Sequence, residues 1–141
     1  MARSQRILLG LLCAVLLIAA VVAIQAAMRS RAHRKQQAFY ASVLRQYSTQ
    51  LKPGMQRGEV EAFLAAQGRA FEQSCCLLES RGSALEDIVK IGSEPKPWYC
   101  SENDMYLVFV FESPPGSAVR VSDASDTLRR VALVPWLGGC L

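Results

Sequence analysis

A long apolar run near the start of the chain dominates its pattern of polar and apolar positions. Ile7 to Ala27 contains no charged side chain and one strongly polar residue, Gln25. An apolar run of about 20 residues is long enough to cross the hydrocarbon core of a bilayer as a helix. A helix of a soluble domain would show a polar stripe every three or four residues. The pattern therefore predicts a transmembrane segment within residues 1–28, in contact with membrane lipid through Ile7 to Ala27.

The flanks of this run bear on cleavage and orientation. Arg3 and Arg6 precede it, as in a signal sequence, but the run exceeds the roughly 7 to 15 apolar residues of a cleaved signal, which favours an uncleaved signal-anchor. Basic residues also follow it, at Arg29, Arg31, Arg34 and Lys35. The positive-inside rule applied to them would keep the rest of the chain in the cytoplasm. The signal-like start and the later cysteines favour the extracytoplasmic side, which we expect.

Helical spacing continues after the apolar run and then recurs once more. Residues 29–51 predict a basic collar and an amphipathic stalk helix, with apolar positions at Phe39, Val43, Leu44, Tyr47 and Leu51. Lys52-Pro53-Gly54 ends this segment, because proline lacks a donor and glycine favours a turn. A second helix is predicted from Arg57 to Gln67, with Glu59 and Glu61 near its start, where carboxylates complement the helix dipole.

Beyond Gly68 the pattern predicts three strands. They are Ala84–Ile91, Met105–Glu112 and Thr127–Val134, and the middle one is apolar on both faces, as in a central strand. Glu102 and Asp104 are interpreted as part of a turn before it. If Phe109 faces Val131, opposed residue numbers sum to 240 along an antiparallel ladder. We predict an α+β domain at 52–141, with two helices packed on a three-stranded antiparallel sheet.

The charge is unevenly distributed, and this excludes one class of function. Six of the 16 Lys and Arg residues lie within the first 35 positions, which leaves ten of them against all 12 Asp and Glu residues. Nucleic-acid binding needs a basic face that displaces counterions from phosphates. The remaining residues have no basic surplus, so we expect no nucleic-acid partner.

Four cysteines follow the apolar run, at Cys75, Cys76, Cys100 and Cys140, while Cys13 lies within it. An even number in a small domain is typical of disulfides in an oxidising compartment, and reduced thiols are the alternative. Extending the 240 register places Cys100 opposite Cys140, so we predict this disulfide and leave Cys75 and Cys76 unassigned. A four-thiolate zinc site would lack the usual C-x-x-C pairs.

Catalytic residue patterns are not evident. His33 is the only histidine and lies in the basic collar, so a triad-type nucleophile has no base within the domain. We predict no catalytic, cofactor-binding or metal site. Trp98, Tyr99 and Trp136 fall near one end of the predicted hairpin, where such rings either cap the core or form a partner surface.

The segment LKPGMQRGEVEAFLAAQG ahead of a sheet resembles the small lipoprotein domains of the SmpA/OmlA type, the fold of the outer-membrane assembly factor BamE. The resemblance covers about residues 50–137. Its residues are Leu51, Gly54, Met55, Glu59, Val60, Leu64 and the strand at Tyr106 to Phe111. This chain lacks the lipidated cysteine of that family and adds its own cysteines. The resemblance implies two helices, a sheet and a non-enzymatic role in binding other proteins.

Together these features predict a membrane-anchored, non-catalytic binding or scaffolding module of a bacterial-type cell envelope, with another envelope protein as partner. The alternative is a cytoplasm-facing, thiol-dependent redox or metal sensor or enzyme.

Overall fold

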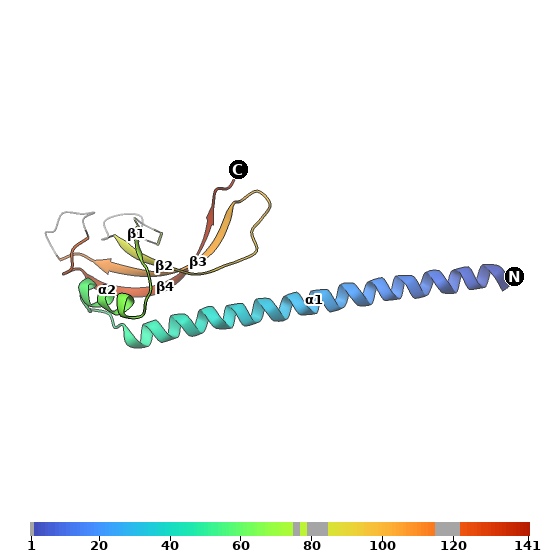
Figure 1. Cartoon of the computed structure of the whole chain (residues 1–141), viewed down its shortest axis with the longest axis horizontal. Helices are drawn as coiled ribbons and strands as arrows, with labels where there is room; N and C mark the ends of the chain where they lie inside the picture. Colours follow the sequence, from blue (N-terminus) through green and yellow to red (C-terminus); the bar gives the residue numbers. More distant parts are fainter. Residues whose placement is uncertain (1, 75–76, 79–84, 115–121) are drawn as a thin grey trace. The chain divides into compact units, whose positions relative to one another are not determined.

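The computed structural model of the chain describes residues 2–74, 77–78, 85–114 and 122–141, with side chains from residue 10 onward (Figure 1). The residues form two compact units, 1–39 and 40–141. The elements in chain order are α1 (Ala2–Gln50), α2 (Arg57–Ala66), β1 (Glu72–Ser74), β2 (Glu86–Ser93), β3 (Glu102–Glu112) and β4 (Thr127–Gly138).

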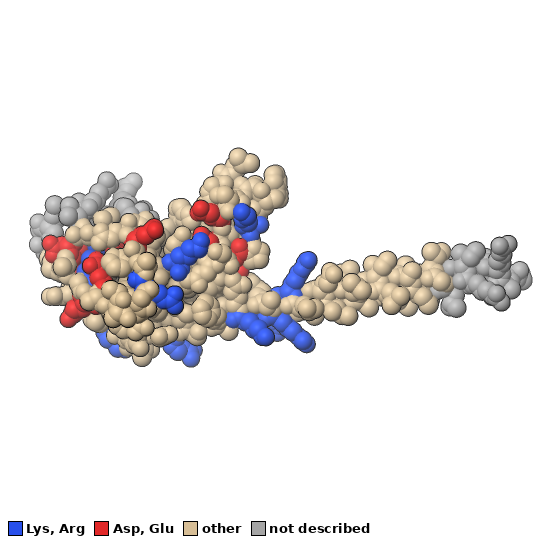
Figure 2. Space-filling model, in the orientation of Figure 1, with Lys and Arg blue, Asp and Glu red and all other residues tan. Residues whose placement is uncertain are grey.

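The first unit is a single helical segment with an apolar stretch followed by basic residues. Among the described residues, α1 contains one stretch long and apolar enough to cross a membrane, and none of its apolar window is buried. Exposed basic side chains gather beside this stretch (Figure 2). The predicted transmembrane segment and stalk helix are therefore one helix, because no glycine or proline interrupts the chain between residues 11 and 52.

The second unit begins inside α1, at Tyr40. Tyr40, Val43 and Tyr47 are buried, while the residues between them are mostly exposed, so one face of this helical turn packs on the domain. Segment Tyr40 to Gln50, predicted as a stalk, thus contributes to the core. Gly92 provides room for it, because a Cβ at that position would lie 2.6 Å from the Tyr40 hydroxyl oxygen.

The sheet has four antiparallel strands in the order β1-β2-β3-β4 (Figure 1). The prediction of three strands was wrong, because β1 is a three-residue polar strand without apolar alternation. The predicted register between β3 and β4 is confirmed, with Phe109 opposite Val131 and Leu107 opposite Leu133. Both strands extend further toward their disulfide end than predicted, with Glu102 opposite Gly138 as the last pair.

The hydrophobic core lies between the helices and one face of the sheet. Leu107, Phe109 and Phe111 alternate along β3 and are at most 1% exposed. The Tyr47 ring meets the Phe109 ring edge to face, with centroids 6.0 Å apart. From α2, Val60 and Leu64 complete this layer without measurable exposure. The core therefore joins the end of α1, α2 and the central strand.

Candidate functional site

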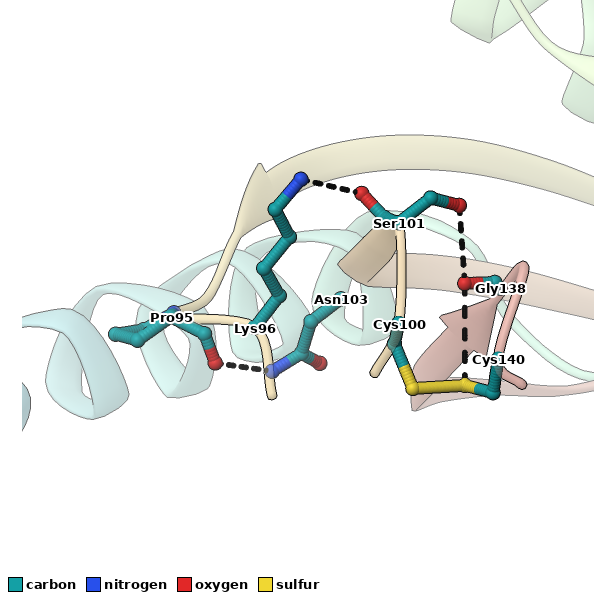
Figure 3. The surroundings of a disulfide bond; sticks show 7 residues. All are labelled: Pro95, Lys96, Cys100, Ser101, Asn103, Gly138 and Cys140. Atoms are coloured by element: carbon teal, nitrogen blue, oxygen red, sulfur yellow. Dashed lines mark hydrogen bonds between the residues drawn. A yellow bond between two sulfur atoms is a disulfide. The ribbon is translucent and has the colours of Figure 1, made fainter. Parts of the chain in front are cut away.

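The β3–β4 hairpin ends in a disulfide-closed tip, defined here as residues 97–101 and 136–141. The Cys100 and Cys140 sulfurs lie 2.05 Å apart, and their Cα atoms are 4.0 Å apart (Figure 3). The predicted pairing is therefore present in the structure. The last pair of the regular strand ladder, Glu102 opposite Gly138, is two residues from each cysteine, so the disulfide adds a covalent link beyond the ladder.

Backbone hydrogen bonds hold the two halves of the tip together. The Ser101 N–H donates to the Gly138 carbonyl oxygen at 3.1 Å, and the Leu141 N–H donates to the Tyr99 carbonyl oxygen at 2.9 Å. The Ser101 hydroxyl also donates to Gly138 (Figure 3). Gly139 has a φ of +57°, and a Cβ there would collide with the Ser101 hydroxyl oxygen. Glycine at this position is therefore required twice, by conformation and by space.

Two side chains brace the segment that leads into the tip. The Lys96 ammonium donates to the Ser101 carbonyl oxygen at 2.8 Å, and the Asn103 amide donates to the Pro95 carbonyl oxygen at 2.8 Å (Figure 3). These bonds tie residues 95–96 to the start of β3. The tip is thus supported on both sides of Cys100.

The tip exposes aromatic surface. Trp98 is 92% exposed, and Tyr99 and Trp136 are 43% and 44% exposed. The Trp98 and Tyr99 rings meet edge to face, with centroids 5.7 Å apart. Leu137 and Leu141 are exposed beside them. These rings do not cap the core, which was one of the two sequence-based interpretations; they are available to solvent or to another molecule.

Other sequence-based candidates are separate from the tip. Cys75 and Cys76 lie outside the described residues, and His33 is exposed on α1. Cys13 is a free thiol in the apolar stretch. Within the parts of the chain that are described, no three His, Cys, Asp or Glu side chains gather as a metal site would require.

Glu102 and Asp104 lie in β3, and their interpretation as a turn was wrong. Asp104 is buried beside β2. The Lys90 ammonium and the Ser93 hydroxyl each donate a hydrogen bond to its carboxylate at 2.6 Å. These two hydrogen bonds, Lys90 first, hold the pKa of Asp104 below its usual value. The Asp104 carboxylate therefore links β3 to β2, and both of its oxygens accept hydrogen bonds from β2.

A cluster of buried charges lies at the other end of the hairpin. Arg57, the first residue of α2, is 1% exposed, and its Nε lies 3.7 Å from Asp126 Oδ2 and its Nη2 4.0 Å from Asp87 Oδ1. The guanidinium also donates to the Leu85 carbonyl oxygen. Its Cζ lies 4.1 Å from the centroid of the Phe111 ring, at cation–π distance. We call Arg57, Asp87 and Asp126 the buried charge cluster.

The pKa of Asp87 is strongly shifted. This pKa is raised to about 7, chiefly because burial disfavours the charged form; the Arg57 guanidinium lowers the pKa, and the Glu61 and Asp126 carboxylates raise it. A carboxyl group with a near-neutral pKa is suited to acid–base catalysis. Asp87 and Asp126 are at most 1% exposed, however, so a substrate does not reach them in this conformation. The geometry favours a structural role, in which Arg57 ties α2 to β2 and to the chain before β4.

The sequence analysis did not predict the buried charge cluster, although two features of the sequence indicate it. Arg57 stands in the first turn of a helix, where a cation opposes the helix dipole. Asp87 shares the core face of its strand with Val89, so a charge interrupts an otherwise apolar stripe. Both residues are explained once they are seen to face each other.

Comparisons with known proteins leave the function to be argued from geometry. No protein family, curated protein or solved structure matches the chain. The tip offers exposed aromatic surface, whereas the buried charge cluster lies where solvent does not reach. Of the two sites, the tip is the one that another molecule can contact directly.

Proposed function

We propose that the chain is a membrane-anchored, non-catalytic binding or scaffolding module of a bacterial-type cell envelope. In this proposal α1 is the anchor, and the tip contacts another envelope protein. The observation that carries the proposal is the exposure of Trp98, Tyr99 and Trp136 on a covalently closed hairpin end.

The composition of the tip supports a binding role. Tryptophan and tyrosine are enriched among the residues that dominate the energy of protein interfaces. Trp98 gains little from folding, because most of its surface stays in water. The disulfide and the tip hydrogen bonds limit its motion before any partner arrives, and this lowers the entropy cost of binding.

The proposed location is the extracytoplasmic side of the membrane. Disulfides persist in oxidising compartments and are rare in the cytosol, so the Cys100–Cys140 bond supports this orientation. We also propose that the domain is related to the SmpA/OmlA type, on the sequence features of residues 50–137. An envelope protein with a complementary apolar surface is then the expected partner.

Site-specific photocrosslinking in intact cells tests the binding role. A benzophenone amino acid replaces Trp98 in one variant and Thr49, which is exposed on α1, in the control. We expect a discrete adduct with another protein from position 98 and a different pattern from position 49. Replacing Trp136 with Ala should weaken the adduct from position 98. Identical patterns from both positions, or adducts with lipid alone, would contradict the proposal.

The four basic residues after the apolar stretch favour a second candidate, a cytoplasm-facing thiol sensor. The two candidates differ in the state of Cys100 and Cys140. In a variant with Ser at positions 13, 75 and 76, a polyethylene-glycol maleimide should modify the cell-extracted, denatured protein only after reduction. Modification without reductant would favour the sensor.

A further inference from the structure

The outer side of β4 is covered over only part of its length. β4 is the last strand of the sheet, and β3 pairs with its inner side. On the outer side, the Gly54 N–H donates to the Leu128 carbonyl oxygen at 2.8 Å, and the Leu128 N–H donates to Met55 at 2.7 Å. Beyond Leu128, no strand of the described chain pairs with this side. We call residues 131–138 the open edge.

Pro135 indicates which backbone groups point outward from the open edge. It lies opposite Met105 in an unbroken register, and a proline has no N–H to donate, so its nitrogen faces away from β3. The two-residue period of a strand gives Val131 and Leu133 the same orientation. The Gly138 carbonyl, of the opposite parity, accepts from Ser101 on the inner side, which agrees with this assignment. Val131 and Leu133 therefore present N–H and C=O groups outward.

The open edge lacks most features that keep sheet edges apart. Natural edges are blocked by lysines, inward-pointing charges, bulges or short strands. No residue from Val131 to Gly138 is charged, and the register with β3 is regular throughout. Pro135 removes a single donor. The edge is thus competent to pair over about half of its length.

The chemistry of this edge selects an extended strand as its occupant, and its sequence suits a second copy of the same strand. Two identical antiparallel strands are related by a twofold axis, so the outward N–H groups of each strand face the outward C=O groups of the other. With the axis at Leu133, the Val131 N–H faces the second copy's Pro135 carbonyl, and Arg130 lies opposite the second copy's Trp136. An arginine beside a half-exposed tryptophan is a favourable pair, and no like charges face each other.

We propose that two copies of this chain associate through the open edge of β4, which forms a continuous antiparallel sheet across a twofold axis at Leu133. This inference goes beyond the proposed function, because it uses the backbone edge of β4. The two share Trp136, whereas the exposed rings of residues 98 and 99 belong to the proposed function alone.

The first test removes one outward N–H. The full chain in detergent micelles is compared with Leu133→Pro and with Leu133→Ala, which keeps the N–H while losing the side chain. Sedimentation over a concentration series gives the dissociation constant. We expect a dimer for the wild type and for Leu133→Ala, and a roughly tenfold or greater weakening for Leu133→Pro, because each copy loses a backbone hydrogen bond. Circular dichroism and the intact Cys100–Cys140 bond check folding.

A second test remains informative if proline at 133 prevents folding. Val134 is half-buried on the sheet face away from the core. In the proposed pair it lies opposite the second copy's Ala132 and diagonally across from the second copy's Val134, within reach of long side chains. We expect Val134→Lys and Val134→Glu each to weaken self-association, and an equimolar mixture of the two to restore a heterodimer. Both variants replace Val134 with a charged residue, so a general loss of stability would persist in the mixture. Only a direct contact between the two copies would let opposite charges restore association.

A wild-type chain that stays monomeric over the whole series would overturn the proposal. So would dimers that Leu133→Pro leaves as tight as the wild type, since these would form through another surface such as α1. A mixture of the two Val134 variants that does not associate would have the same meaning. If Leu133→Pro abolished a contact to a different protein and left the mass unchanged, the edge would belong to that protein and not to a second copy.

Discussion

The two ends of the β3–β4 hairpin depart from the usual distribution of side chains in opposite ways. At the end near Thr127, the charged groups of Arg57, Asp87 and Asp126 are buried. At the other end, Trp98 and Trp136 are exposed. Charged residues are seldom fully buried unless they are paired, and large apolar residues gain most when they leave water. One end of the domain therefore pairs its unusual residues with one another, and the other end leaves them exposed.

This difference shows how each end is held. The buried charge cluster depends on mutual neutralisation, because its carboxylates have few hydrogen bonds of their own, and Asp87 accepts none from the described residues. The tip depends on a covalent bond and on backbone hydrogen bonds, which do not use the exposed side chains. Mutations in the buried charge cluster should therefore affect stability, whereas mutations of the exposed rings at the tip should affect the proposed binding and leave stability nearly unchanged.

The largest effect is expected from Arg57→Ala. It leaves two buried carboxylates without their cation, which should lower the free energy of unfolding by about 3–5 kcal/mol. Chemical denaturation of the full chain in detergent measures this loss. Arg45→Ala is the matched control, because that arginine is exposed on α1. Equal stability of the two variants would show that the buried charge cluster does not hold α2 to the sheet.

Breaking the tip disulfide should have the next largest effect. Replacing Cys100 and Cys140 with Ser removes a crosslink between residues 40 positions apart. The unfolded chain then gains freedom, and we expect a loss of about 2–4 kcal/mol. The reduced wild type should unfold at the same denaturant concentration as the double variant, and Cys13→Ser should match the oxidised wild type. Indistinguishable oxidised and reduced proteins would contradict the assigned role of the bond.

Asp87→Asn should remove a pH dependence of stability between about pH 4 and 7. Because the folded pKa of Asp87 is raised from 3.8 to about 7, the folded protein holds a proton that the unfolded chain releases between these values. Its contribution to stability therefore falls as pH rises from about 4 to 7. The Asn variant should lose this slope in denaturation series across that range.

Asp123→Asn is the control, because the pKa of Asp123 is shifted in the opposite direction to that of Asp87. Hydrogen bonds from the Ser125 hydroxyl and backbone hold the pKa of Asp123 below its usual value, so its contribution disappears as pH falls. If both variants kept the wild-type slope between pH 4 and 7, the buried carboxyl would not be the titrating group.

The smallest effect on stability is expected from Trp98→Ala. Its ring is almost fully exposed, so the free energy of unfolding should change by no more than about 0.5 kcal/mol. Phe109→Ala, in the buried core, should lose about 3–5 kcal/mol in the same assay. A large loss for Trp98→Ala would mean that the tip aromatics support the fold, and the contrast between the two ends would fail.

The sequence predicted some parts of this structure to the residue and missed others for physical reasons. The assumed register, with Phe109 opposite Val131, holds from Glu102 to Val110, and the same register predicts the Cys100–Cys140 pair. β1 was missed because a short polar strand takes its pairing from β2 and not from its own pattern. The buried charge cluster was missed because a charged side chain is usually solvated, and only the packed fold brings these three together.

The exposure of Trp98 and Trp136 was not decided by sequence either. Whether a ring near a strand end is covered depends on the layer above it, and the helices cover the sheet further along, around Leu107 to Phe111. The sequence placed the aromatics correctly along the hairpin but could not say what lies over them.

The contact between Tyr40 and Gly92 defines how much of the chain a folded fragment needs. The phenol occupies the space where any other residue at 92 would carry a side chain, so the sheet accepts the ring only because its own backbone is bare there. A recombinant polypeptide that starts at Tyr40 would keep every helical residue of the core, whereas one trimmed past Tyr47 would expose Phe109 to water. Crystallisation or NMR work on the isolated domain should therefore begin no later than Tyr40.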